Sequence, residues 1–373
     1  MSLRDRKLRV MDIRGCGWIP CRVGIFPTTW NKYRESLEEV VMRHPRLFPG
    51  FTRGSVNFDD FGDRVGGREL MDDFGCLWRF NISGLQGQVV KHPLEDWGNL
   101  QNYKFPDPER GIVYEGTGTV PWQAVEEGVE RARGVDDIVV GNMPHGFFFQ
   151  RLYYLRGFRN LMVDLVREPP QLERLIEMLT DYNLALVRRL IKLKVDVIYF
   201  GDDLGLQDRM PIGERIFRRF VFPAYRRIFQ EVRRSGIRVY LHTDGHVMEV
   251  AEDLIEAGVS VLNIQDRVNG VENIRRGLKG RVCIDLDIDR QYVVPFGTPD
   301  MIREHIRRAV FELGSRDGGL MMYSEIHSDV PLENIDAVCT AMEDFMDYYN
   351  EHRQSRDLER YEGNSLTRHD LTP

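Results

Sequence analysis

Residues 195–203 read VDVIYFGDD, an apolar and β-branched run that ends in glycine and two acids. A run of this length, bounded by turn residues, predicts a strand that is buried on both faces. The residues before it, opened by Pro169-Pro170, repeat apolar side chains near every 3.6 positions as far as Leu190 and predict a helix. A helix that leads into a fully buried strand is the repeating unit of a parallel α/β sheet.

The same unit recurs through the C-terminal half. Strands are predicted at 237–241, 259–264, 282–286 and 319–323, separated by helices at 211–235, 247–257, 271–278 and 299–313. Upstream, 137–142 predicts another strand, and 15–26 is expected to hold the first. This alternation predicts an α/β fold, a TIM (β/α)8 barrel with an elaborated N-terminal region.

We expect a single barrel domain over residues 1–373, with an insertion at 53–108 and a flexible tail at 355–373. The insertion is rich in Gly, Asp and aromatic residues. Its large aromatic side chains, Phe74, Trp78, Trp97 and Tyr103, are expected to pack the insertion against the barrel. An alternative stays open for Cys76 and Trp78, which would instead reach the rim of the active site.

Composition excludes several classes of protein. The formal net charge of −7 disfavours a nucleic-acid binder, because such proteins need a positive surface to neutralise phosphates. The sequence contains no apolar run of 18 residues, so no membrane span is predicted, and the charged N-terminus lacks the apolar core of a signal peptide. The five cysteines are scattered without a CxxC pair, which is typical of free thiols in a reducing compartment. We therefore expect a cytoplasmic protein.

Ionisable residues follow the predicted strands, where barrel enzymes carry their active sites. His242 and Asp244 follow one strand with the i, i+2 spacing that points two side chains to the same side, and Glu325 and His327 follow the last strand in the same way. These four supply nitrogen and oxygen ligands that suit zinc or another divalent metal. His242 and Glu325 are the first choice as ligands. The alternative is a metal-free pocket whose carboxylates act as acid and base.

Roles are assigned to other residues at the same strand ends. Asp203, His242 and Glu325 are predicted to be catalytic, and the residues predicted to bind substrate are Asp202, Asp266, Asp287, Tyr154 and Asn142. If the barrel is correct, His242, Asp266, Asp287 and Glu325 must all lie at one mouth of it.

Seven short motifs are spread over nearly the whole chain: DFGCLW at 73–78, HPLEDW at 92–97, YKFPDP at 103–108, LYYLRGF at 152–158, GDDLG at 201–205, LHTDG at 241–245 and PLENI at 331–335. In these motifs the chain resembles the uroporphyrinogen decarboxylase superfamily, and more closely its methyltransferase-like branch, which serves corrinoid-dependent methyl transfer. The resemblance implies a TIM barrel and a homodimer.

Two departures from the family pattern bear on the reaction. The decarboxylases carry an N-terminal M-R-Q-A-G-R segment whose arginines hold the substrate carboxylates, whereas residues 16–24 here read CGWIPCRVG, with Arg22 as the one cation. The zinc methyltransferases of the branch carry two cysteine ligands, and here Asp244 stands for the first and Ser324 or Glu325 for the second. An oxygen-rich site of this kind suits an ether or amine methyl group better than a thiol acceptor.

The leading hypothesis is therefore a methyltransferase component that passes a methyl group between a small methylated substrate and cobalamin on a separate corrinoid protein. A decarboxylase or other lyase acting on a small acid is the alternative, with Asp203 or His242 handling the proton. A third possibility is a barrel that binds without catalysing.

Overall fold

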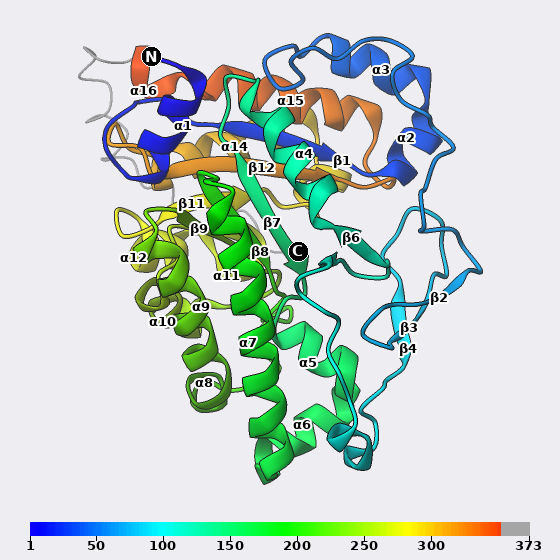
Figure 1. Cartoon of the computed structure of the whole chain (residues 1–373). Coiled ribbons are helices and arrows are strands. Elements are labelled where there is room, and N and C mark those ends of the chain that lie inside the picture. The colour runs from blue at the N-terminus through cyan, green and yellow to red at the C-terminus, as the bar shows by residue number, and fades with distance from the viewer. Residues whose placement is uncertain (352–373) are drawn as a thin grey trace.

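The computed structural model describes residues 1–351, so the predicted tail at 355–373 lies outside the described residues. Its centre is a curled, all-parallel sheet of seven strands in the order β1-β12-β11-β10-β9-β8-β7 (Figure 1). The strands are β1 (Cys21–Ile25), β7 (Val140–His145), β8 (Val197–Gly201), β9 (Arg238–His242), β10 (Val261–Gln265), β11 (Cys283–Asp287) and β12 (Leu320–Ile326). All seven were predicted, with shifts of a few residues at their ends.

Helices connect the strands and cover the outside of the sheet (Figure 1). They are α5 (Phe149–Arg156), α6 (Phe158–Arg167), α7 (Pro170–Lys192), α8 (Glu214–Ile216), the π-helix η2 (Phe217–Val221), α9 (Phe222–Arg234), η3 (Met248–Val250), α10 (Ala251–Ala257), α11 (Asp266–Asn269), α12 (Val271–Leu278), α13 (Val293–Phe296), α14 (Pro299–Leu313), α15 (Leu332–Phe345) and α16 (Tyr348–Glu351). Helix α7 begins with a proline at its first position, where the missing N–H costs nothing, in agreement with the prediction.

Alternate residues of each strand face opposite sides of the sheet, and both sides are buried. In β8, Ile198 and Phe200 belong to the large core shared with the helices, whereas Val197 joins a second cluster inside the curl of the sheet. Helix α1 (Leu3–Met11) contributes Val10 and Met11 to this inner cluster. The inner side is thus filled by apolar residues at one end of the strands, and the polar site lies at the other.

The sheet is TIM-barrel-like, but seven strands are hydrogen-bonded where eight were expected. Within residues 1–351, β1 and β7 form its two edges and do not pair with each other. The chain between them holds α2 (Pro27–Tyr33), α3 (Glu35–Met42), β2 (Glu69–Met71), β3 (Leu77–Arg79), β4 (Gln88–Lys91), η1 (Trp97–Gln101), β5 (Gly111–Val113), β6 (Thr119–Pro121) and α4 (Trp122–Arg133). Strands β2 to β4 form a small antiparallel sheet, and β5 pairs with β6.

The aromatic residues of the 53–108 segment pack against the barrel, as predicted. Phe74 meets Tyr182 of α7 edge-on at 5.4 Å between ring centroids, and Trp78 meets Tyr154 of α5 at 4.9 Å. Cys76 is fully buried and contacts the carbonyl oxygen of Tyr154. The alternative that Cys76 and Trp78 reach a rim is therefore wrong, because both are enclosed in the contact with α5. No helix in the described part of the chain has the length and apolar character needed to cross a membrane.

Candidate functional site

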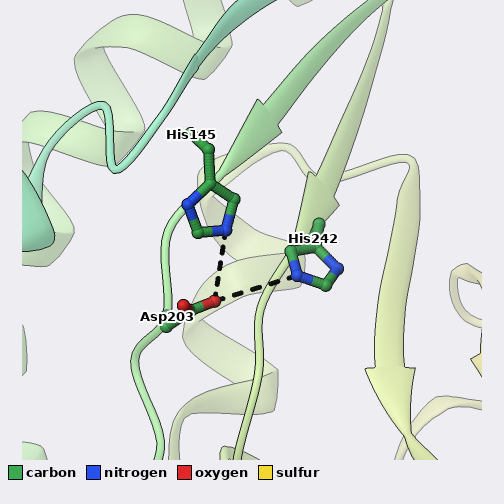
Figure 2. A group of neighbouring side chains, drawn as sticks. All are labelled: His145, Asp203 and His242. Atoms are coloured by element: carbon green, nitrogen blue, oxygen red, sulfur yellow. Dashed lines mark ion pairs between the residues drawn. The ribbon is translucent and has the colours of Figure 1, made fainter. Parts of the chain in front are cut away.

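Three side chains at the C-terminal ends of neighbouring strands converge on one point (Figure 2). His145 ends β7, Asp203 follows β8, and His242 ends β9. The Nε2 atom of His145 lies 3.4 Å from Oδ1 of Asp203, and Nε2 of His242 lies 3.8 Å from the same oxygen. The three residues form a triad in which each side chain offers one metal-ligating atom, and these atoms all lie within 4.8 Å of one another.

These separations fit a shared metal ion. Two ligands that are each about 2.1 Å from a tetrahedral ion lie about 3.4 Å from each other. The two contacts to Asp203 are close to that edge and are longer than a good N–H···O hydrogen bond. Two imidazoles and one carboxylate are also a common ligand set of catalytic zinc, which keeps a further position open for substrate.

Other groups hold the Asp203 carboxylate in this orientation. Gln150 of α5 donates its side-chain N–H to Oδ2 at 3.0 Å and accepts the backbone N–H of Asp203 at 2.9 Å. The backbone N–H of Asp244 donates to Oδ1 at 3.1 Å. With Oδ2 bound to Gln150, Oδ1 is left facing the two imidazoles.

The hydrogen-bond partner of His242 fixes which of its nitrogens carries the proton. Asn263 of β10 donates its side-chain N–H to the carbonyl oxygen of Asp285 at 2.7 Å, so its own oxygen faces His242. Nδ1 of His242 therefore donates to Oδ1 of Asn263, at 2.6 Å. The lone pair of the neutral imidazole is then on Nε2, which is the atom that faces Asp203.

His145 has a carboxylate behind it. Oε2 of the buried Glu115 lies 3.4 Å from Nδ1 of His145, and Glu115 in turn accepts hydrogen bonds from Tyr154 at 2.6 Å and Gln86 at 2.8 Å. Burial opposes a charge on His145, but Asp203 and Glu115 outweigh burial and raise the pKa of His145 well above its usual value. Burial likewise opposes the charge on Asp203, and the contacts with His145 still lower the pKa of Asp203.

Lack of space for a Cβ atom explains three glycines at the site. A Cβ atom on Gly201 would lie 2.5 Å from Cδ2 of His145, so this imidazole needs a glycine beside it. Gly205 and Gly245 approach so closely that a Cβ on either would overlap the backbone of the other loop. The hydrogen bond from Gly205 N–H to the carbonyl oxygen of Asp244, at 3.0 Å, joins the loops that carry Asp203 and Asp244.

Next to the triad, Arg290 binds a group of acids. Its Nη2 atom lies 2.5 Å from Oδ2 of Asp244, and its Nη1 atom contacts Glu325 and lies 3.5 Å from Asp287. His327 lies beside Glu325, with Nε2 at 2.8 Å from Oε1. Burial opposes the charge on Glu325, yet His327 and Arg290 lower the pKa of Glu325. Burial raises the pKa of Asp287 well above its usual value, and only Arg290 among its main neighbours opposes that shift.

Below these groups, Arg22 of β1 reaches across the inside of the sheet. Its guanidinium donates to Asp285 at 3.0 Å and to the hydroxyl of Tyr240 at 2.7 Å, and it lies over the ring of Tyr323. Asp285 is fully buried, but the side chain of Arg22 is 47% exposed. The cation is therefore accessible as well as paired.

Some of the predicted site residues face the mouth of the barrel, and the side chains of others turn away from it. His242, Asp287 and Glu325 lie at the ends of β9, β11 and β12, and Asp266 directly follows β10, so the predicted position of these four residues at one edge of the sheet is confirmed, but the prediction that all four face one pocket is wrong for Asp266. The carboxylate of Asp266, however, turns outward to His305 of α14 at 2.6 Å.

Asp202 also turns away from the triad. It is fully buried and accepts the backbone N–H groups of Phe149 and Gln150 at the start of α5 and the hydroxyl of Tyr225. Burial is the largest influence on it and raises the pKa of Asp202 to about 6, although these three donors favour its charged form. Its carboxylate joins β8 to two helices instead of facing the mouth.

Asn142 and Tyr154 differ in exposure and in their relation to the triad. Asn142 of β7 is exposed and lies beside Tyr199 of β8 in the sheet register. Tyr154 is buried and its hydroxyl donates to Glu115. Tyr154 thus contacts the triad through Glu115, and its predicted role in substrate binding stays a prediction.

The structure does not bring the four predicted metal ligands to one point. Asp244 lies 3.6 Å from Nε2 of His242, but Arg290 stands between Asp244 and Glu325. Of the predicted ligands, only His242 belongs to the triad, and Asp203 joins it from the predicted catalytic residues.

Four residues of the site were missed in the sequence: His145, Glu115, Asn263 and Arg290. His145 had a usable signal, because it closely follows the predicted strand 137–142. Asn263 was included in a predicted strand, and nothing in the sequence set apart Glu115 or Arg290 from the many other charged residues.

Comparison with known proteins agrees with this fold. Solved structures with a similar fold include a methyltransferase from Methanosarcina mazei, with a TM-score of 0.62 and 18% sequence identity over 92% of this chain and 99% of that chain. A dihydropteroate synthase from Xanthomonas albilineans, with a TM-score of 0.28 and 16% identity over 40% of this chain and 57% of that chain, is too distant to carry an argument. No curated protein matches the chain.

A family model gives a more specific result. The model described as "Uroporphyrinogen decarboxylase (URO-D)" matches residues 139–345, which is more than half of the 373-residue chain. The matched segment starts before β7 and ends with α15, so it includes six of the seven strands and all three residues of the triad. The chain therefore belongs to the uroporphyrinogen decarboxylase family.

Proposed function

We propose that this chain is a metal-dependent methyltransferase component, which takes a methyl group from a small ether or amine and passes it to a corrinoid cofactor on a separate protein. The observation that carries the proposal is the triad, in which two imidazole Nε2 atoms and one carboxylate oxygen converge at metal-ligand separations. Family membership and the methyltransferase-like fold over 92% of the chain support it.

The residues present fit a divalent ion such as zinc. Nε2 of His145, Oδ1 of Asp203 and Nε2 of His242 would hold it, with Glu115 and Asn263 behind the two imidazoles as the outer partners that such ligands usually have. When bound, the ion supplies Lewis acidity, which draws electron density from the oxygen or nitrogen that carries the methyl group.

The chain's own residues position the substrate and handle the proton. In the transfer, the methyl carbon separates from its oxygen or nitrogen, which keeps the bonding electron pair and must gain one proton. His327 is suited to supply that proton, because it is 36% exposed and pairs with Glu325 at 2.8 Å. Phe26 stacks on the His327 ring at 4.2 Å and limits its rotation.

Metal binding is the first test. Protein purified without chelator is analysed for metal content, then stripped and titrated with zinc, for the wild type and for Asp203→Asn and His242→Ala. We expect one zinc per chain in the wild type and at least about a tenfold weaker affinity in both variants. Asp208→Asn is the matched control, since Asp208 is an exposed acid on the same loop that pairs with Arg209. Equal, weak zinc uptake by all four proteins would refute the proposal.

Methyl transfer is tested separately with free cob(I)alamin as the acceptor and methoxybenzoate or trimethylamine as the donor. The absorbance change of the corrinoid measures transfer, and we expect it to require zinc and to be lost in Asp203→Asn. Zinc-loaded wild type that shows no transfer with any O-methyl or N-methyl donor would argue against this reaction while leaving the metal site in place.

One observation favours a second candidate, decarboxylation of a small acid. The half-exposed guanidinium of Arg22, inside the sheet, offers a cation to a substrate carboxylate. Here the bond to the carboxylate carbon breaks, carbon dioxide leaves, and the remaining carbon gains one proton, with Asp203 or His242 as the group that handles it. Release of carbon dioxide from a panel of small acids, lost in Arg22→Met, identifies this reaction. A barrel that only binds ligands would show neither activity.

A further inference from the structure

Arg290 occupies the centre of a group of acids that come from three different strands. Asp244 follows β9, Asp287 ends β11 and Glu325 lies in β12, and all three lie within 3.5 Å of its guanidinium nitrogens. The side chain of Arg290 is 12% exposed, so it is held inside the protein and not at its surface.

The same acids belong to a second set of metal-ligating groups. Oδ1 of Asp244 lies 3.6 Å from Nε2 of His242, and Oε1 of Glu325 lies 2.8 Å from Nε2 of His327. Asp287 is 1% exposed, and neither of its carboxylate oxygens has a hydrogen-bond partner among residues 1–351. A buried carboxylate without such partners, beside two further acids, can keep its charge only with a cation next to it.

In this protein the cation is a side chain. A guanidinium stays protonated at every pH that the folded chain tolerates, so Arg290 gives this group of acids one permanent positive charge. It also binds one oxygen each of Asp244 and Glu325, which turns those oxygens away from any shared ion. Because the guanidinium lies between them and binds both, the predicted ligands Asp244 and Glu325 do not meet at one point.

We propose that Arg290 determines where metal binds at the mouth of the barrel: its guanidinium stands in place of an ion between Asp244 and Glu325 and thereby confines a divalent metal to His145, Asp203 and His242. The confinement of a metal to His145, Asp203 and His242 rests on the proposed function. The role of the guanidinium as a substitute for an ion does not rest on it, and this role predicts that removal of the guanidinium creates a metal site at Asp244 and Glu325.

The test counts zinc ions per chain by elemental analysis after dialysis and measures affinity by calorimetry. Wild type is compared with Arg290→Met and Arg290→Gln, both without the charge, and with Arg290→Lys, which keeps it. We expect one zinc in the wild type and in Arg290→Lys, and two in Arg290→Met and Arg290→Gln. The second zinc must disappear when Glu325→Gln is added. Substitution with cobalt(II) should show a second set of d–d absorption bands in the same variants.

Arg267→Met is the matched control, because Arg267 pairs with a single buried acid, Asp289, at 3.1 Å on the neighbouring strand end. It should leave the zinc count at one. Circular dichroism and thermal unfolding identify any variant that does not fold, and Arg290→Gln, which can still donate hydrogen bonds to the acids, provides the answer if Arg290→Met fails to fold.

Failure of this inference is distinguishable from failure of the proposed function. If folded Arg290→Met and Arg290→Gln still bind one zinc, and Asp203→Asn abolishes it, the inference is overturned and the triad stands. If the wild type binds none, and Arg290→Met binds one that depends on Glu325 and not on Asp203, the proposed triad fails while the role of Arg290 as a substitute for an ion is supported.

Discussion

Asn263 shows how a single neutral side chain sets the chemistry of a neighbour. Its amide group is oriented by the carbonyl oxygen of Asp285, and its oxygen then accepts a hydrogen bond from Nδ1 of His242. Glu115 faces Nδ1 of His145 in the same way. Both imidazoles are thereby turned so that Nε2 faces Asp203, which is the arrangement that metal binding requires.

Replacing Asn263 should weaken the proposed metal binding without changing any of the three proposed ligands. Asn263→Leu removes the acceptor, so His242 is free to rotate or to carry its proton on Nε2, and we expect zinc affinity to fall about 10- to 100-fold. Titration of stripped protein measures the change. Asn160→Leu serves as the control, since the Asn160 side chain bonds to the helix carbonyl of Arg156 and not to a residue of the triad. Wild-type zinc affinity in folded Asn263→Leu would contradict this account of His242.

The polar residues at the strand ends have two different kinds of contact. Some of them face the mouth, as His145, Asp203 and His242 do, and others fasten the sheet to its outer helices. Asp202 binds the first amides of α5, and Asp266 binds His305 of α14. A carboxylate at a strand end is therefore a weak indication of catalysis until its partners are known.

The contact between α14 and the end of β10 should make stability depend on pH. Burial opposes the charge on His305, but Asp266 and Asp289 outweigh burial and the nearby Arg308 and raise the pKa of His305. A raised pKa in the folded state contributes stability that is fully present below the unfolded pKa of about 6.5 and is lost as pH rises through the folded pKa.

His305→Gln should therefore lower the free energy of unfolding by about 1–3 kcal/mol at pH 6.5 and by less at pH 9.5. Urea unfolding at the two pH values measures the difference. His92→Gln is the control, because His92 bonds to the carbonyl oxygen of Tyr154 and not to an acid. A loss for His305→Gln that is the same at both pH values would show that its charge does not contribute.

Across the molecule as a whole, the segment between β1 and β7 is held to the barrel by a buried ion pair as well as by its aromatic residues. Arg151 of α5 is 1% exposed and lies 3.3 Å from Asp72, with its guanidinium over the ring of Phe74. Asp72 also accepts hydrogen bonds from the backbone of Cys76 and the indole of Trp78. Helix α5 thus carries Gln150 toward the triad on one side and Arg151 toward this segment on the other.

Arg151→Met should detach the segment. Breaking a buried ion pair from one side leaves an uncompensated charge on Asp72, and we expect a loss of about 3–5 kcal/mol in the free energy of unfolding. Limited proteolysis should then cut first between residues 53 and 108. Arg159→Met, a change at an exposed position of α6, is the control and should have little effect. Protease resistance equal to that of the wild type would show that the aromatic contacts suffice.

The order of the helices and strands, and the edge of the sheet at which the site lies, follow from the amino-acid pattern alone. Hydrophobic periodicity is a local property, so each strand from β7 to β12 can be located from its own residues. Parallel strands bring their carboxyl ends to one edge, and this rule is sufficient to place His242, Asp287 and Glu325 together.

Which of those side chains meet depends on tertiary contacts. The partners of an acid lie on other strands and helices: Asp202 turns to α5 and α9, Asp266 to α14, and Asp244 and Glu325 to Arg290. His145 reaches Asp203 because β7 is irregular between Asn142 and His145 and because Gly201 leaves room for its ring. These are contacts between residues far apart in the chain, and no local pattern of charge or spacing encodes them.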